Sequence, residues 1–496
     1  MSDFAPSPSA LLTGRAAPFA RPPTEATPLK GEASSSSPLP SWGRQCFDIG
    51  PSASYEVSGK WHAFFNEMMC LVGIGSLTLP YATAQVGLTI SLLGLGLLSY
   101  ISWEGIRFLA YCAAHLREER AHEIESGSAG EPAAAAKAAA ALSTRDRGAW
   151  HLISTHAFGQ AGWICTMTSL TVAQIGVAAA YVAYVEGTLR YAMHTDLRST
   201  LLLLWLVFSL LSLLLNPGMR SIAWLSGFAL TVMVYIYILI VYFACQTHVN
   251  ELPALIQFNL TNIGLWYGPA LFSFEGMGSA LSIYDSMGSV DPKPFVDVIS
   301  WSYIVSCLLY ATVIVAGYVG WGPNVNRMII LNFPKSPLGQ SASYILAAAL
   351  TCSYVLQMTP IFQMVEDALP QHLDRTWAAL RMALVGMTIL IAFAVPSVEK
   401  ICSLTGAVAF STLCFVLPGA YFLKINPKGM PSSTGGVYEK IVAVILIPLG
   451  LGLGLWSLVE TVRDTGVVDH VIGRHHPQVG APPASPPNPP FGDARL

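Results

Sequence analysis

Eleven long apolar stretches run through this chain of 496 residues, and few charges interrupt them. A helix needs about 20 mostly apolar residues to cross the hydrocarbon of a bilayer, so each stretch is a candidate membrane span. Runs such as LLLLWLVFSLLSLLL do not alternate apolar with polar residues, which argues against a barrel. The predicted spans cover residues 61–84, 86–108, 161–185, 199–215, 222–245, 264–284, 298–321, 340–363, 379–396, 401–423 and 438–459.

The composition supports an all-α membrane protein and excludes several other classes. Hydrophobic residues make up 53% of the chain and charged residues 11%, less than half the share of about 25% in a typical soluble domain. The net charge of −3 and the lack of a basic stripe argue against nucleic acid as a partner. The nine cysteines form no CxxC pair and no zinc-type spacing with histidine, so we predict neither a metal nor a cofactor.

Three segments outside the spans differ in composition. Residues 1–58 are rich in proline and serine and contain no apolar run long enough for a signal peptide, so we expect a disordered tail. Residues 117–149 form a long charged and alanine-rich loop after the second span, and residues 461–496 form a proline-rich tail, which leaves a membrane domain at 59–460. Most of the lysines and arginines lie on the side of the N-terminal tail and this loop, which predicts a cytoplasmic N-terminus.

Two spans carry glycine pairs near their centres. The first contains Gly73-Ile74-Gly75-Ser76 followed by Pro80, and the sixth contains Phe274-Glu275-Gly276-Met277-Gly278. Small residues often serve only for close packing between helices. The matched positions in spans one and six, together with a carboxylate beside the second pair, favour interrupted helices instead. Interrupted helices at corresponding positions of two halves are typical of the binding site of a secondary transporter.

A helix break in a membrane is chemically suited to a small zwitterion. The half-helix that restarts after the break exposes N–H groups and the positive end of its dipole, which attract a carboxylate. The half-helix that stops leaves free carbonyl groups, which accept hydrogen bonds from an ammonium group or ligate a cation. An amino acid needs both kinds of group close together.

The two glycine elements resemble signatures of the amino acid/auxin permease family, especially its proton-coupled and vesicular branches. The first-span run from Phe65-Asn66 through GIGSLTLPYATAQVGL is similar to the family's Gly-x-Gly-x-Leu-x-Leu-Pro-Tyr-Ala motif, and FSFEGMG is similar to its Phe-x-Phe-Glu-Gly-Ile-Gly motif. Two departures are Met277 in place of isoleucine and Ser282-Ile283-Tyr284-Asp285 in place of Pro-Leu-Glu-Asn.

The resemblance implies a LeuT-type fold, in which spans 1–5 and 6–10 form inverted repeats and an eleventh helix follows. It also implies transport of amino acids by alternating access. Substrate-binding residues carried over from the matching motifs are Gly73, Ile74, Gly75 and Ser76, through backbone atoms, and Phe274, Glu275 and Gly276.

Polar residues inside the spans are candidates for binding a coupling ion. Glu275 is, on this reading, the one acid near the middle of a span, and it serves either in proton or substrate chemistry or in holding the break together. The hydroxyls of Thr351 and Ser353 in the eighth span offer a sodium site, or bond only to their own helix. Glu104 and Arg107 either pair along one helix face or extend toward the headgroups.

These features predict a secondary active transporter of neutral amino acids, driven by protons in preference to sodium. The alternatives are a sodium-coupled transporter and an amino acid sensor that signals through its cytoplasmic tail. An enzyme is not expected, because the spans contain no HExxH element and no serine–histidine pair. The amino acid that is moved stays open, as does the choice between the plasma membrane and a vacuolar or lysosomal membrane.

Overall fold

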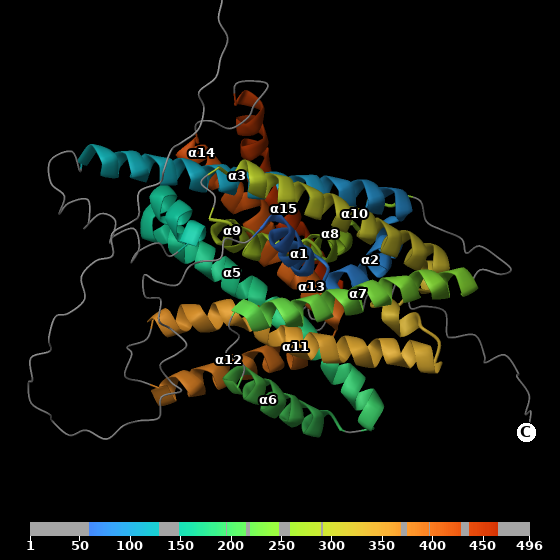
Figure 1. Cartoon of the computed structure of the whole chain (residues 1–496). Helices are drawn as coiled ribbons and strands as arrows, with labels where there is room; N and C mark the ends of the chain where they lie inside the picture. The colour runs from blue at the N-terminus through green and yellow to red at the C-terminus, as the bar shows by residue number, and fades with distance from the viewer. Residues whose placement is uncertain are drawn as a thin grey trace, which may run out of the picture. The chain divides into compact units, whose positions relative to one another are not determined.

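The computed structural model describes residues 59–127, 148–194, 196–214, 219–247, 258–288, 291–368, 374–395, 397–427 and 436–464. Within these ranges all regular structure is helical (Figure 1). The predicted tail at 1–58, the centre of the predicted loop at 128–147 and the chain after residue 464 lie outside the described residues.

The first five predicted spans correspond to helices in the same order. The first is divided into α1 (Lys60–Leu71), the 3₁₀ turn η2 (Ile74–Thr78) and α2 (Leu79–Val86). The next four are α3 (Leu88–Gly127), α5 (Gly148–Met193), α6 (Leu197–Leu214) and α7 (Met219–Thr247).

The second half repeats this order. The sixth span is divided into α8 (Ile263–Phe272) and α9 (Met277–Ser286). After it come α10 (Lys293–Trp321), the short turns η3 (Gly322–Asn324) and η4 (Ile329–Asn332), α11 (Pro337–Ala368) and α12 (Asp374–Ala394). The tenth span comprises α13 (Val398–Thr405), η5 (Gly406–Phe410), η6 (Thr412–Val416) and α14 (Leu417–Ile425), and α15 (Val437–Asp464) is the eleventh.

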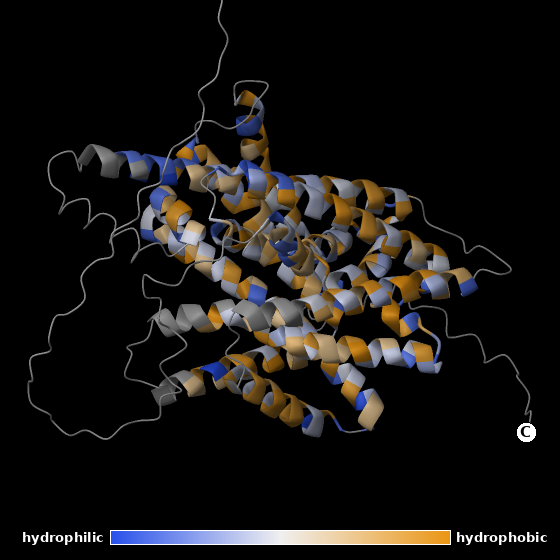
Figure 2. Cartoon of the chain, viewed as in Figure 1, coloured by the Kyte–Doolittle hydropathy of each residue, from blue (hydrophilic) through white to orange (hydrophobic). Residues whose placement is uncertain are grey.

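The lengths and surfaces of these helices fit a membrane. Eight of the described helical segments are long and apolar enough to cross it, α6 and α12 are shorter apolar helices, and the broken α8–α9 pair occupies the sixth position. Hydrophobic residues are spread along the helices, whereas the left-hand end of α3 is mostly hydrophilic (Figure 2). Leu93, Leu308 and Leu455 expose more than half of their surface, as side chains in contact with lipid do. The order of elements, with breaks in spans one and six, is the predicted LeuT-type arrangement.

The segment after the second span, predicted as a charged and partly helical linker, begins as a continuation of α3. The helix runs to Gly127 because residues 117–127 are mostly arginine, glutamate and alanine, which are good helix formers. At the other end, α5 already begins at Gly148 and bends at Phe158 and Gly159, where Gly159 has φ +61°. The third span therefore includes a helical segment before its bend that apolar length alone does not predict.

Glycines allow the broken helices to pack tightly within the helical core. Helix α8 lies against α2, α13, η5 and α15, and α1 lies against α7, α9 and α10 (Figure 1). A Cβ on Gly406 would overlap the carbonyl oxygen of Gly268, and a Cβ on Gly268 would lie 2.6 Å from the carbonyl oxygen of Ser403. This contact holds the first half of the sixth span against the tenth span.

Candidate functional site

The predicted break in the first span is present. Helix α1 ends at Leu71, Gly73 is extended with φ −116° and ψ −173°, and the chain resumes as the 3₁₀ turn η2 before α2 begins. Gly73 is partly accessible, whereas Ile74, Gly75 and Ser76 are buried. The backbone of this segment is therefore outside the regular helical hydrogen-bond pattern in the interior of the protein.

Hydroxyl groups fix the shape of this break. Ser76 Oγ donates to the carbonyl oxygen of Gly73 at 2.8 Å, and Thr78 Oγ1 donates to that of Gly75 at 2.7 Å. Tyr237 on α7 donates to Ser76 Oγ at 2.6 Å. Ser76 thus contributes to the site by holding the backbone, and its side chain is already fully engaged in protein contacts.

The sixth span breaks at the predicted place as well. Helix α8 ends at Phe272, residues 273–276 form turns, and α9 begins at Met277. The ring of Phe274 is fully buried, stacks on Tyr303 with centroids 5.8 Å apart and meets Tyr310 edge-on at 5.4 Å. Both tyrosines belong to α10. Phe274 therefore anchors the break to α10, and Glu275 beside it is partly accessible.

The two breaks lie directly against each other. A Cβ on Gly75 would be 2.6 Å from Cδ1 of Phe272 and 3.2 Å from Cα of Ser273, so this approach requires glycine. The hydroxyl of the buried Tyr310 faces the carbonyl oxygens of Leu71 and Ser273, the latter at 2.8 Å, and can donate to either. One side chain of α10 thus joins the carbonyl ends of both broken helices.

A carboxyl group lies close to each break in the sequence. Each of the two carboxyl groups packs against a glycine of the other break. Glu275 Oε1 is 3.0 Å from the position of a Cβ on Gly73, and Glu67 Oε1 is 2.5 Å from that of a Cβ on Gly276. Glu67, on α1, is fully buried. Glu275 Oε2 and both carboxyl oxygens of Glu67 are buried without a hydrogen-bond partner among the described residues.

Glu67 is a second buried acid beside the breaks, which the sequence analysis did not single out. The sequence contained a signal for it, since Glu67 interrupts an apolar run one helical turn before the break. Its position near the start of the predicted span made it look like a residue at the membrane border. Its burial depends on α9 and α10, which are distant in the sequence.

Partly accessible groups gather on the α9 side of the breaks. Gln357 of α11 donates to Oε1 of Gln174 on α5, and Gln174 Nε2 lies 3.8 Å from the position of a Cβ on Gly278. Four helices and the two breaks contribute to this polar surface. The helices are α1, α5, α9 and α11, with Cys70, Gln174, Gly278, Ser279 and Gln357, and the breaks add Gly73 and Glu275. By contrast, α8 is almost entirely buried from Gly264 onward.

The predicted sodium ligands lie on α11, which packs mainly against α5 and α7. Thr351 Oγ1 donates to the carbonyl oxygen of Ala347 at 2.8 Å, which is the ordinary bond of a hydroxyl to its own helix. Ser353 is partly accessible. The described contacts join neither residue to the two breaks.

Ion pairs connect helices near the α9 end of the protein. Arg117 on α3 pairs with Asp285 on α9, whose other oxygen accepts from the backbone N–H of Ala149 at 2.9 Å. This aspartate belongs to the segment that departs from the family motif. Glu104 and Arg107 also pair, at 2.5 Å, with the glutamate fully buried, so the alternative of extension to the headgroups was wrong for Glu104.

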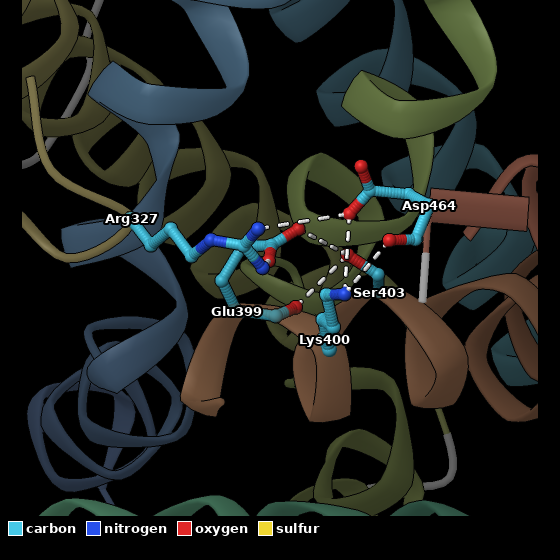
Figure 3. Close-up of polar contacts among 5 residues, drawn as sticks. All are labelled: Arg327, Glu399, Lys400, Ser403 and Asp464. Atoms are coloured by element: carbon cyan, nitrogen blue, oxygen red, sulfur yellow. Dashed lines mark hydrogen bonds and ion pairs between the residues drawn. The ribbon is translucent and has the colours of Figure 1, made fainter. Parts of the chain in front are cut away.

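A second cluster of charges joins the far ends of the tenth and eleventh spans (Figure 3). Arg327, between η3 and η4, lies 3.2 Å from Glu399 and 3.8 Å from Asp464, and Lys400 lies 3.3 Å from Asp464. Ser403 donates to the Glu399 carboxylate at 3.1 Å. This ion-pair cluster ties the segment after α10 to α13 and α15.

A helical membrane protein whose first and sixth spans break against each other, with carboxyl groups at the breaks, has the construction of a secondary transporter. The sequence profile of the family described as transmembrane amino acid transporter protein matches residues 56–463, and the chain belongs to this family. This confirms the resemblance to the amino acid/auxin permeases. The family is one of transporters and not of enzymes, in agreement with the sequence prediction.

Several relatives carry related names. The chain is 28% identical over 272 residues to vacuolar amino acid transporter 3 of Schizosaccharomyces pombe, covering 51% of this chain and 40% of the relative. It is 30% identical over 252 residues to amino acid transporter AVT1H of Arabidopsis thaliana, covering 49% and 57%. Amino acid transporter AVT3B of the same plant is 23% identical over 417 residues, covering 81% and 93%. The chain thus spans about half the length of the first two relatives.

Proposed function

We propose that this protein moves neutral amino acids across a membrane by alternating access, in symport with protons. The observation that carries the proposal is the contact between the two helix breaks, with Glu275 placed against the backbone of Gly73. Family membership supports amino acids as the substrate class.

The breaks supply both kinds of group that a zwitterion needs. Helix α1 ends at Leu71 and α8 at Phe272, so carbonyl groups in their last turns lie outside the helical pattern and can accept hydrogen bonds from an ammonium group. The Leu71 carbonyl itself accepts from Gly73 N–H and from Tyr310. The first residues of η2 and α9 present N–H groups and a positive dipole end to a carboxylate. In this proposal Gly73, Ile74, Gly75 and Ser76 bind through their backbone, and Glu275 faces the ammonium group.

The partly accessible polar surface supports a neutral substrate. Its side-chain groups beyond Glu275 are two amides, a thiol and a hydroxyl, and none of them carries a fixed charge to match a charged substrate side chain. The names of the relatives favour a vacuolar or lysosomal membrane, and the distribution of lysine and arginine favours a cytoplasmic N-terminus.

The test is uptake by the purified protein in liposomes. We expect labelled neutral amino acids to accumulate under an imposed pH gradient, and sodium to be dispensable. Glu275→Gln should reduce both accumulation and substrate binding by at least about tenfold, whereas Glu186→Gln, a matched change in an exposed ion pair of α5, should leave them unchanged.

Two results would contradict the proposal. Folded protein that accumulates none of the common amino acids would refute amino acid transport. Accumulation that follows a sodium gradient and is lost in Thr351→Ala or Ser353→Ala would show that transport is coupled to sodium and not to protons.

A further inference from the structure

We propose that Glu67 is a second ion-binding carboxyl, which binds the coupling proton and links its release to the separation of α1 from α9. The inference deepens the proposed transport function and rests on it. No motif singles out Glu67, and its position follows from the packing of the two broken helices.

The starting point is the isolation of this carboxyl group. Glu67 is fully buried, and neither of its oxygens has a hydrogen-bond partner among the described residues. An ionised carboxylate in such surroundings loses its hydration without gaining a partner, which is highly unfavourable. Glu67 must therefore hold a cation, or a proton, in the conformation described here.

The groups around Glu67 point to a proton. On its own helix, Cys70 lies one turn further on, and α10 brings Tyr303 and Tyr310 within electrostatic range. Tyr303 Oη is itself buried without a hydrogen-bond partner, so a donor and an acceptor lie unpaired in the same region. A transition metal such as zinc needs more ligands, and the described residues contain no group of three histidine, cysteine or acidic side chains able to hold one.

The charged and titratable groups on the elements packed against α1 lie further away or have other partners in the described part of the chain. Between α1 and α10 the ion pair is Lys60–Asp297, two helical turns before Glu67. From α7, Tyr237 is bonded to Ser76. On α9 the titratable residues are Tyr284 and Asp285 near its end, where they contact Arg117. Glu275 is the remaining acid nearby, since both Glu275 and Glu67 lie within electrostatic range of Cys70.

A route for the proton lies along the α1–α9 contact. Cys70 on α1 and Ser279 on α9 are both partly accessible, and they lie close together on this contact beside Glu67. The proton moves from water to a Glu67 oxygen, forming an O–H bond, and returns to water on release, so no electrons are transferred.

The coupling follows from where Glu67 lies against α9. Its carboxyl group packs on Gly276, directly before the first residue of α9. When neutral, it can stay buried there and α1 remains packed on α9. When the proton leaves, the carboxylate requires water, and hydration is gained by moving α1 away from α9. Proton release and opening on this side are therefore one event.

The experiment separates net transport from exchange in liposomes. Glu67→Gln, which mimics the neutral carboxyl, should retain exchange of labelled for unlabelled amino acid within about threefold of the wild type. Its accumulation under a pH gradient should fall at least about tenfold, and its exchange rate should lose pH dependence. Glu275→Gln should lose both activities, and Glu186→Gln neither. Wild-type accumulation and pH dependence in Glu67→Gln would overturn the proposal.

A second measurement uses the wild-type protein, so its result does not depend on whether the Glu67→Gln variant folds. A hydrophobic carbodiimide reacts with protonated buried carboxyls, so mass spectrometry should find Glu67 modified, with the yield falling as pH rises. The modification should block accumulation and spare exchange. Absence of modification at every pH would refute protonation of Glu67, whether or not the protein transports amino acids. Absence of any uptake, with Glu67 modified as expected, would instead count against the proposed function alone.

Discussion

The hydroxyl of Tyr310 offers a direct test of how the two helix breaks are held together. It is fully buried on α10 and faces the carbonyl oxygens of Leu71 and Ser273. The substitution Tyr310→Phe removes this single donor and keeps the ring that packs on Phe274. The change therefore isolates the hydrogen bond from the packing.

The expected loss can be worked out from that geometry. One hydroxyl proton makes one good bond at a time, so the substitution removes one bond. It takes from the Ser273 carbonyl its donor from α10, whereas the Leu71 carbonyl still accepts from Gly73 N–H at 2.8 Å. Such a loss costs about 1–3 kcal/mol. For a chain of this size each kcal/mol lowers the unfolding midpoint by about 1 °C, which gives a decrease of roughly 1–3 °C.

Thermal unfolding of the purified protein in detergent measures this effect, with uptake measured in parallel. The matched control is Tyr242→Phe on the exposed surface of α7, which should leave the midpoint within about 0.5 °C of the wild type. If Tyr310→Phe behaves like that control in both assays, the hydroxyl does not hold the breaks, and the geometry proposed for the site is wrong.

Three further predictions follow from single contacts. Gly75→Ala places a Cβ 2.6 Å from Phe272, so we expect a loss of stability of about 1–3 kcal/mol and of uptake, while Gly96→Ala, with open space at its Cβ, should be neutral in the same assays. Gln174→Leu should lower uptake of glutamine relative to leucine by about tenfold in competition experiments, because it removes an amide from the polar surface, and an unchanged ratio would exclude Gln174 from the substrate pocket. Arg327→Gln leaves the buried Glu399 carboxylate without its ion pair with Arg327. Calorimetry should therefore show a free energy of unfolding about 1–2 kcal/mol below that of the wild type, and this difference should be smaller in high salt.

The positions of the breaks could be predicted because their causes are local. Gly73, Gly75 and Pro80 weaken helical hydrogen bonding wherever they stand, and the pair at Gly276 and Gly278 does the same in the sixth span. The number and order of the spans follow from apolar length in the same way. The carboxyl beside the second break, Glu275, is adjacent in sequence and was recognised with it.

The contacts that complete the site could not be predicted, because they depend on packing between distant segments. Glu67 faces Gly276, and Tyr310 faces the ends of both α1 and α8, yet no local pattern marks either residue as a partner. Asp285 is similar, since its partner Arg117 lies on α3 beyond the predicted end of the second span.

The tenth span contains a feature with mechanical consequences. Its segments η5 and η6 are wound as π-helix, with i→i+5 bonding, on either side of Ser411. Each wide turn stores one residue beyond the α-helical count, so rewinding a turn to α geometry would rotate the preceding segment by about 100° and shift it by about 1.5 Å. Since that segment carries Glu399, the same rewinding would withdraw its carboxylate from Arg327. The winding of the tenth span and the ion pair between Glu399 and Arg327 are therefore geometrically linked through one continuous segment.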